Sequence, residues 1–166
     1  ALLSGPVIHC DETVVQVLKE PDKPPQSPSY MWVQAGGPPP HNIILFDYHP
    51  SRSGQVPLRL LEGYRGYLMT DGYEGYNAIA AGDGITHLCC WAHARRKFVE
   101  AKRAQPKTKG AAKTGKVDVA LNFIGKLYGI EQGLRGSDRE THYRIRQRDS
   151  VPASPGNPPI KSGVQK

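Results

Sequence analysis

Two aspartates in the first half of the chain each follow a short apolar run. Asp11 comes after Val-Ile-His-Cys, and Asp71 comes after Tyr-Leu-Met-Thr. A carboxylate at the tip of a buried strand is held rigidly at the edge of a sheet, and two such carboxylates side by side can ligate Mg²⁺ or Mn²⁺ through oxygen. The competing explanation is that each aspartate caps the turn or helix after its strand. The pair predicts a metal site with Asp11 and Asp71 as ligands.

A second group of chemically capable side chains lies further along the chain. Cys90 and His93 form a Cys-x-x-His pair, which is a poor basis for structural zinc because no second Cys or His pair lies at zinc-finger spacing. Packing, or support of a neighbouring site, explains this pair better. Arg95, Arg96 and Lys97 follow on the same predicted helix, where they could pair with phosphate oxygens. The alternative for these three residues is a solvated helix face.

These residues must be positioned by a series of short strands and helices. Apolar runs separated by turn-rich segments predict a three-stranded meander at residues 6–10, 30–34 and 42–48. Further strands are predicted at 66–70 and 85–90. Helices are predicted from a cap at residue 51 to about residue 62, around 76–81, at 92–104 and at 117–134.

The order of these elements predicts the fold. Three strands, a helix, a strand, a helix and a strand is the order of the ribonuclease H-like fold, which many nucleic-acid-cutting enzymes use. We therefore predict an α/β protein with a ribonuclease H-like mixed five-stranded sheet and flanking helices, followed by basic helices and a disordered tail.

Length and composition are those of a globular protein with one sizeable core. The chain has 166 residues, of which 38% are hydrophobic and 22% charged. No apolar run approaches the roughly 20 residues that a membrane span needs, so we expect no membrane partner. The three cysteines, Cys10, Cys89 and Cys90, are odd in number, and two of them are adjacent, which argues against a disulfide framework. Reduced thiols and the lack of a secretion signal lead us to expect a cytoplasmic protein.

Charge is divided unequally along the chain. Residues 1–94 carry five Lys or Arg against nine Asp or Glu, a balance of −4, whereas residues 95–148 carry fifteen against five, a balance of +10. An acidic segment with suspected metal ligands, followed by a basic one, suits a protein that presents a metal to a polyanion and holds its phosphates. A solvated basic helix with a flexible linker is the alternative. We predict a core at 1–104, a basic linker at 105–116, a helical segment at 117–148 and a disordered Pro-, Gly- and Ser-rich tail at 149–166.

Four separate segments resemble one family of proteins. His-Cys-Asp-Glu-Thr, Ser-Tyr-Met-Trp-Val-Gln, Leu-Leu-Glu-Gly-Tyr-Arg-Gly-Tyr-Leu-Met-Thr-Asp-Gly-Tyr and Cys-Trp-Ala-His-Ala-Arg-Arg-Lys-Phe begin at residues 9, 29, 60 and 90. In this order they are similar to the catalytic core of transposases of the insertion sequence 66 family, and the resemblance covers about residues 4–148.

The resemblance implies a DDE-type transposase, in which two aspartates and a later glutamate hold two divalent metals, Mg²⁺ or Mn²⁺. By position, Asp11 and Asp71 match the two family aspartates. One metal would activate water or a DNA 3′ hydroxyl for attack on a phosphodiester, and the other would stabilise the leaving oxygen. Glu12 is a poor candidate for the same metal because successive strand residues point to opposite faces. The resemblance also suggests that His93 contacts the scissile phosphate, with Arg95, Arg96 and Lys97 binding DNA beside it.

The sequence departs from the family pattern at its ends. The family's third acid, a glutamate on a later helix, and its N-terminal DNA-binding segments have no counterpart here. We therefore expect a catalytic-core fragment for transposition of an insertion sequence, with weak metal binding and no activity on its own. The alternative is a non-catalytic DNA-binding or regulatory remnant of a transposase. The expected partners are DNA at the insertion-sequence ends and a second copy of the chain or a full-length transposase.

Overall fold

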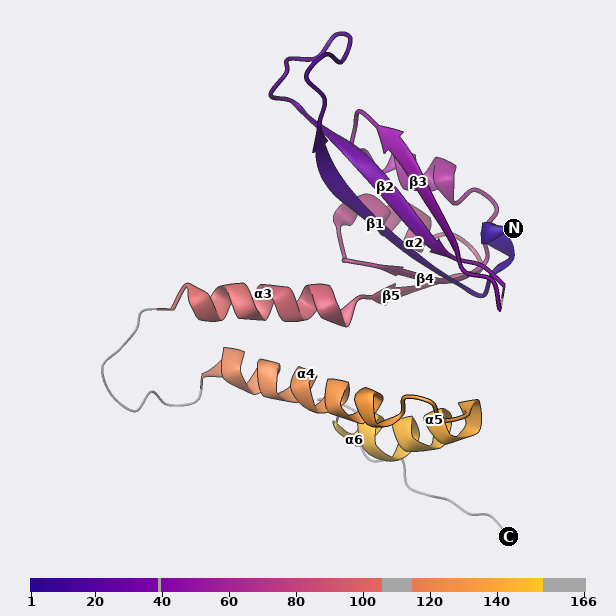
Figure 1. The fold of residues 1–166 in the computed structure, drawn as a ribbon, viewed down its shortest axis with the longest axis vertical. Coiled ribbons are helices and arrows are strands. Elements are labelled where there is room, and N and C mark those ends of the chain that lie inside the picture. The colour runs from indigo at the N-terminus through magenta and orange to yellow at the C-terminus, as the bar shows by residue number, and fades with distance from the viewer. Residues whose placement is uncertain (39, 106–114, 154–166) are drawn as a thin grey trace. The chain divides into compact units, whose positions relative to one another are not determined.

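The computed structural model describes residues 1–38, 40–105 and 115–153 of the chain (Figure 1). The chain divides into two compact units, Ala1–Cys90 and Trp91–Lys166. The boundary between them falls inside the region that we predicted as one core, residues 1–104. Most of the predicted linker and the end of the predicted tail lie outside the described residues, whereas residues 149–153 of that tail are helical.

The first unit contains a mixed sheet in the order β3-β2-β1-β4-β5. Its strands are β1 (Val7–Gln16), β2 (Pro28–Gly36), β3 (Ile43–His49), β4 (Gly66–Thr70) and β5 (Ile85–Cys89). β2 pairs antiparallel with both β1 and β3, whereas β4 pairs parallel with both β1 and β5. Because parallel neighbours need a crossover, helices separate β3, β4 and β5 in the chain. The predicted α/β fold with a mixed five-stranded sheet is confirmed.

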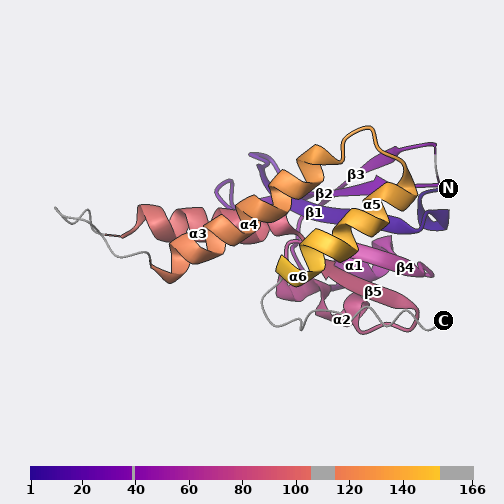
Figure 2. The same ribbon diagram turned by 90° about the horizontal axis from the view of Figure 1, so that it is seen from below.

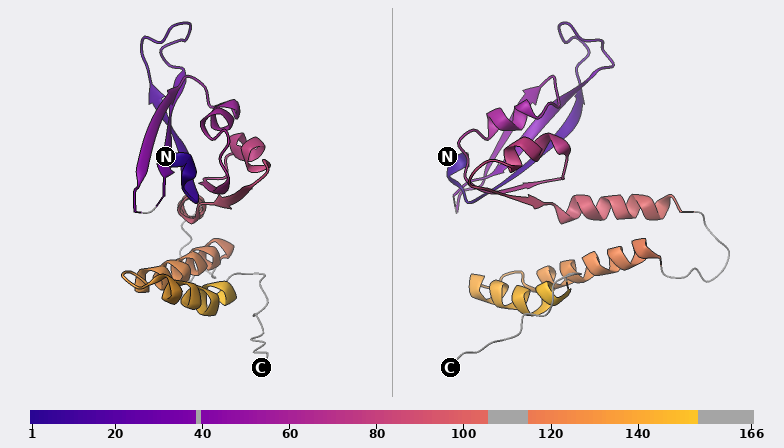
Figure 3. Two further views of the ribbon diagram at one scale, coloured as in Figure 1. Left: turned by 90° about the vertical axis from the view of Figure 1, so that its right-hand side faces the viewer. Right: turned by 180° about the vertical axis from the view of Figure 1, so that it is seen from behind.

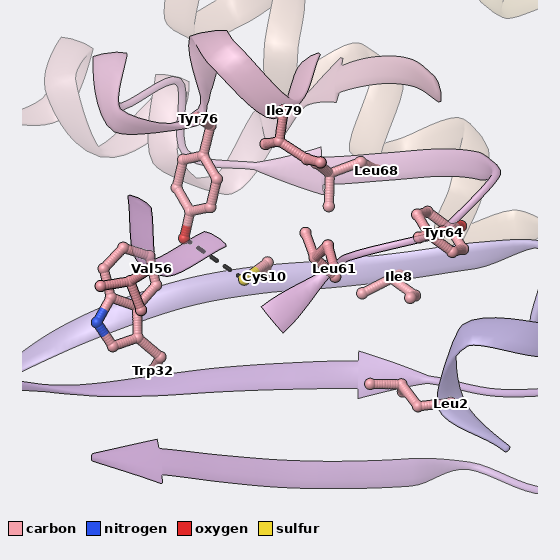
Figure 4. Packing of buried hydrophobic residues seen from close by; sticks show 10 residues of the cluster. All are labelled: Leu2, Ile8, Cys10, Trp32, Val56, Leu61, Tyr64, Leu68, Tyr76 and Ile79. Atoms are coloured by element: carbon pink, nitrogen blue, oxygen red, sulfur yellow. Dashed lines mark hydrogen bonds between the residues drawn. The ribbon is translucent and has the colours of Figure 1, made fainter. Parts of the chain in front are cut away.

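Short helices cover one face of this sheet (Figure 3). They are α1 (Gln55–Leu60), the 3-10 turn η2 (Glu74–Tyr76) and α2 (Asn77–Ala80), and a further 3-10 turn, η1 (Leu2–Ser4), precedes β1. Ile8 and Leu68 are opposite each other on the paired strands β1 and β4, and both are fully buried. Trp32 of β2 meets the ring of Tyr76 edge to face, with 5.9 Å between ring centroids, which closes the core between the sheet and the helices (Figure 4).

The strand that carries the first aspartate is longer than predicted. We expected it to end at Cys10 and to leave Asp11 at its tip, but β1 continues to Gln16 and pairs with β2 along its whole second half. The β-branched residues Thr13, Val14 and Val15 favour this extended, paired conformation. Asp11 therefore lies inside β1, where it pairs with Val33 of β2, two residues beyond the last residue pair of β1 with β4.

The second unit consists of helices. They are α3 (Trp91–Arg103), α4 (Lys116–Gly133), α5 (Arg139–Ile145), a π-type turn η3 (Arg146–Ser150) and α6 (Val151–Ala153). α3 and α4 lie side by side (Figure 2), where the rings of Trp91 and Phe123 are 6.0 Å apart. Asp138 caps α5 by accepting a hydrogen bond from the Thr141 N–H at 2.8 Å. Across the described ranges, no helix combines the length and the apolar character that crossing a membrane requires.

Candidate active site

The register of the parallel strands brings the two candidate metal ligands to the same level of the sheet. Ile8 pairs with Leu68, and His9 pairs with Met69. The pairing of the two strands ends there; continued two residues further, the same register puts Asp11 level with Asp71, the residue after the end of β4. Parallel neighbours lie about 4.8 Å apart, so the two aspartates belong to adjacent backbone segments. This placement follows from pairing between residues that are far apart in the sequence.

The turn after β4 fixes the second aspartate. Gly72 has a positive φ of 86°, which a residue with a side chain rarely adopts, and it bends the chain directly after Asp71. The Tyr73 N–H then donates to Asp71 Oδ1 at 2.8 Å. Asp71 therefore does cap the turn after its strand, which was the alternative to metal binding. The cap engages one of the two carboxylate oxygens and orients the group, so it is compatible with a metal on the other oxygen.

Asp11 and the residue after it point to different faces of β1. Asp11 is solvent-exposed and accepts a hydrogen bond from the Glu12 N–H at 3.0 Å. The Glu12 side chain is only 1% exposed and lies on the core face with Cys10. There Glu12 Oε2 accepts a hydrogen bond from the Tyr76 hydroxyl at 2.6 Å. Asp11 is thus the carboxylate of this pair that faces water.

Arg52, which no sequence pattern indicated, contacts Glu12 beside Asp11. Arg52 lies between β3 and α1, and its Nε and Nη2 are 2.7 and 2.5 Å from Glu12 Oε1. Its guanidinium carbon lies 3.7 Å from the ring centroid of Tyr73, and the Tyr73 hydroxyl donates to the Arg52 carbonyl at 2.9 Å. The only sequence signal for Arg52 was its rarity, since it is one of five Lys or Arg in residues 1–94.

The protonation states in this cluster are set by burial and by these contacts. Burial raises the pKa of the Cys10 thiol to about 11; the Tyr76 hydrogen bond opposes this shift, and the nearby charges of Glu12 and Asp11 add to it. Burial also raises the pKa of Tyr76, reinforced by Cys10 and by the bond to Glu12. Both groups therefore keep their protons at neutral pH, and Tyr76 acts as a hydrogen-bond donor.

The predicted DNA-binding residues fall in the other unit. They are His93, Arg95, Arg96 and Lys97. They lie on α3 and belong to the second unit, whereas the two aspartates belong to the first. Arg95, Arg96 and Lys97 are exposed, and Lys97 lies 3.9 Å from Glu100. Within the described residues no group of three or more His, Cys, Asp or Glu side chains could hold a metal ion, and this includes the surroundings of Cys90 and His93.

The element order and the mixed five-stranded sheet define the class of protein as α/β, and comparison with known proteins defines the family. The chain belongs to the family described as "Transposase IS66 family", whose model matches residues 1–156. The membership predicted from four sequence segments is therefore confirmed.

The chain is also similar to curated proteins from Sinorhizobium fredii (strain NBRC 101917 / NGR234). It is 33% identical to "Uncharacterized protein y4hP" over 126 residues, which are 70% of this chain and 23% of that protein. It is 29% identical to "Uncharacterized protein y4jD" over 161 residues, which are 90% of this chain and 30% of that protein. The chain thus spans less than a third of the length of these relatives. No solved structure matches it significantly.

Proposed function

We propose that this chain is the catalytic-core part of a transposase, which cleaves phosphodiesters and transfers strands at the ends of an insertion sequence with Asp11 and Asp71 as metal ligands. One observation carries the proposal: β1 and β4 are parallel neighbours, and their register, continued two residues past the pair His9–Met69, puts Asp11 level with Asp71 just after the end of β4. Family membership supports the reaction class. DNA is the substrate that such a reaction requires.

The two carboxylates fit the coordination habits of Mg²⁺. This ion usually keeps several waters and is bound by one or two carboxylates together with substrate phosphates, instead of by a complete cage of protein ligands. Among the described residues no group of three or more His, Cys, Asp or Glu side chains could hold a metal ion. Binding of Mg²⁺ by two carboxylates is compatible with this finding. Two carboxylates alone bind weakly, so DNA phosphate is expected to increase metal affinity.

Each residue near the pair has a definite task in this proposal. Asp71 would be held in one orientation by the Tyr73 N–H, and Asp11 would be held by the pairing of β1 with β2, where it lies opposite Val33. A metal bound there supplies Lewis-acid activation of the attacking oxygen and stabilises the leaving oxygen. Tyr76 and Arg52 keep the Glu12 carboxylate engaged on the core face. In this proposal Asp11 and Asp71 would be the metal ligands, and Glu12 would have a structural role.

The second unit would bind the DNA backbone. Its described residues carry twelve Lys or Arg against six Asp or Glu, a balance of +6. Arg95, Arg96 and Lys97 are exposed on one stretch of α3, and arginine matches phosphate oxygens in bidentate fashion. His93 is half-buried on the same helix and would be positioned by it. Phosphate contacts of this kind are independent of DNA sequence.

The basic charge of the helical unit and the two-carboxylate site also favour a second function. A basic helical unit, together with an acidic pair that no third ligand joins among the described residues, also suits a non-catalytic regulator that binds DNA or pairs with a longer transposase. Such a protein would retain salt-sensitive DNA binding and would not need divalent metal. The two functions therefore differ in metal dependence, which can be measured.

The discriminating experiment is a nicking assay with the full chain on supercoiled DNA that carries the terminal repeats of the element. Nicking that requires Mg²⁺ or Mn²⁺ and disappears in Asp71→Asn supports the transposase core. Asp47→Asn is the matched control, because Asp47 is a carboxylate of the same sheet that pairs with Arg59 on the surface. DNA binding without metal-dependent nicking would reject the catalytic proposal for this chain and support the regulator.

A further inference from the structure

Arg52 touches the neighbours of both candidate metal ligands. Its guanidinium binds Glu12, which follows Asp11 on β1, and stacks on Tyr73, which lies in the turn that begins at Asp71. The charge of Asp71 also acts on it: burial lowers the pKa of Arg52, but the bond to Glu12 and the charges of Glu12, Tyr73 and Asp71 outweigh this and raise it. Arg52 is therefore a cation built into the aspartate site.

Part of this arginine faces water although its partner does not. The Arg52 side chain is 39% exposed, whereas that of Glu12 is 1% exposed. The contacts with Glu12 use Nε and Nη2. Because a guanidinium has five N–H donors in a fixed planar fork, the edge formed by Nη1 takes no part in these contacts. In this ion pair the arginine is thus partly accessible to water, whereas the carboxylate is buried.

Contacts within the protein also fix the orientation of the Arg52 guanidinium before any ligand binds. Two nitrogens contact one carboxylate oxygen, the ring of Tyr73 lies against the guanidinium, and the Tyr73 hydroxyl bonds to the Arg52 carbonyl. A planar cation that is fixed in this way loses little conformational freedom when it binds a second anion. Neutralisation of Glu12 alone would not require the guanidinium to be exposed.

We propose that Arg52 binds a non-bridging phosphate oxygen of the DNA strand at the Asp11–Asp71 site through Nη1, which its bonds to Glu12 do not use. The inference rests on the proposed function in that DNA is the ligand. Three carboxylates, Asp11, Glu12 and Asp71, lie near Arg52, so its positive charge offsets part of their repulsion of an approaching phosphate. Guanidinium geometry matches phosphate oxygens better than an ammonium does.

The test measures how salt weakens binding of the full chain to a short DNA duplex of arbitrary sequence. Removing Arg52 alone would leave Glu12 buried without its cation, so the variant to use is Glu12→Gln/Arg52→Gln, compared with Glu12→Gln. For one lost phosphate contact, the slope of log Kobs against log salt should become shallower by about 0.9. Arg59→Gln removes the same charge from α1 in the same unit and should leave the parent slope unchanged.

Equal slopes for the double variant and for Glu12→Gln would overturn the inference, as would an equal loss in Arg59→Gln. Thermal unfolding of each variant confirms that a change in slope does not reflect unfolding. This readout needs neither bound metal nor cleavage. If metal-dependent nicking fails while the slope changes, the catalytic proposal fails and the Arg52 contact stands. If nicking succeeds and the slope is unchanged, only the Arg52 contact is rejected.

Discussion

Replacing Arg52 alone is expected to destabilise the first unit strongly. The Glu12 side chain is 1% exposed and is held by two nitrogens of Arg52 and by the Tyr76 hydroxyl. Breaking a buried ion pair by removing one partner costs about 3–5 kcal/mol, because a buried charge remains. Arg52 is 39% exposed, so water can approach Glu12, and Tyr76 still donates. For Arg52→Gln we therefore expect a loss of ~2–3 kcal/mol in the free energy of unfolding.

The double variant Glu12→Gln/Arg52→Gln should recover most of this loss. With both charges gone, no buried ion remains, and the expected change is within about 1 kcal/mol of the parent. Thermal unfolding followed by circular dichroism measures both variants. For a unit of this size, 1 kcal/mol corresponds to about 4–8 °C in Tm, so Arg52→Gln should unfold on the order of 10–20 °C below the parent.

A matched control is available on the surface of the same unit. Arg59 pairs with Asp47 at 2.9 Å, and their side chains are 57% and 34% exposed. Arg59→Gln should cost no more than about 1 kcal/mol, as is usual for exposed pairs. The reasoning is refuted if Arg52→Gln is as stable as Arg59→Gln, or if the double variant is as unstable as Arg52→Gln.

Three further predictions concern packing, capping and thiol chemistry. Leu68→Ala, at a fully buried position, should lower the free energy of unfolding by about 2–5 kcal/mol in urea titrations, and a loss below about 1 kcal/mol would argue against this core. Asp138→Ala should lower the Tm of the helical unit, whereas Asp138→Asn, which keeps an acceptor oxygen at the N-cap, should lower it less. The Thr141 N–H lowers the pKa of Asp138, so this stabilisation is present above the ordinary value of 3.8 and is lost as pH falls below it. In native protein a thiol reagent should modify exposed Cys89 before Cys10, whose pKa is about 11; equal rates would contradict its burial.

Local patterns in the sequence were sufficient for the elements of the sheet but not for their limits. Short apolar runs separated by turn-rich segments predicted the five strands, and the structure confirms the mixed sheet. The end of β1 was predicted wrongly because the apolar run is interrupted by Asp11, Glu12 and Thr13, and the place of these residues in a strand depends on pairing with β2. The signal that could have extended the strand was the β-branched run from Thr13 to Val15.

The contacts around the aspartates depend on residues that are distant in sequence. Glu12 and Arg52 are separated by 40 residues, and Glu12 and Tyr76 by 64, so no local pattern links them. A buried glutamate was also unexpected, because carboxylates are rarely buried unless they are paired. In contrast, the turn between α4 and α5 carried readable signals. Gly136 has a φ of 81°, and Asp138 is the N-cap of α5.

The most direct test of the central claim is a Mn²⁺ titration of the full chain followed by electron paramagnetic resonance, which counts free metal without requiring catalysis. We predict that the parent and Asp47→Asn bind Mn²⁺ equally, and that Asp11→Asn and Asp71→Asn each bind it ~10-fold or more weakly, since loss of a ligand should cost at least as much as loss of a residue that orients one. Equal binding by all four proteins, or a loss in only one of the two aspartate variants, would contradict a metal site shared by Asp11 and Asp71.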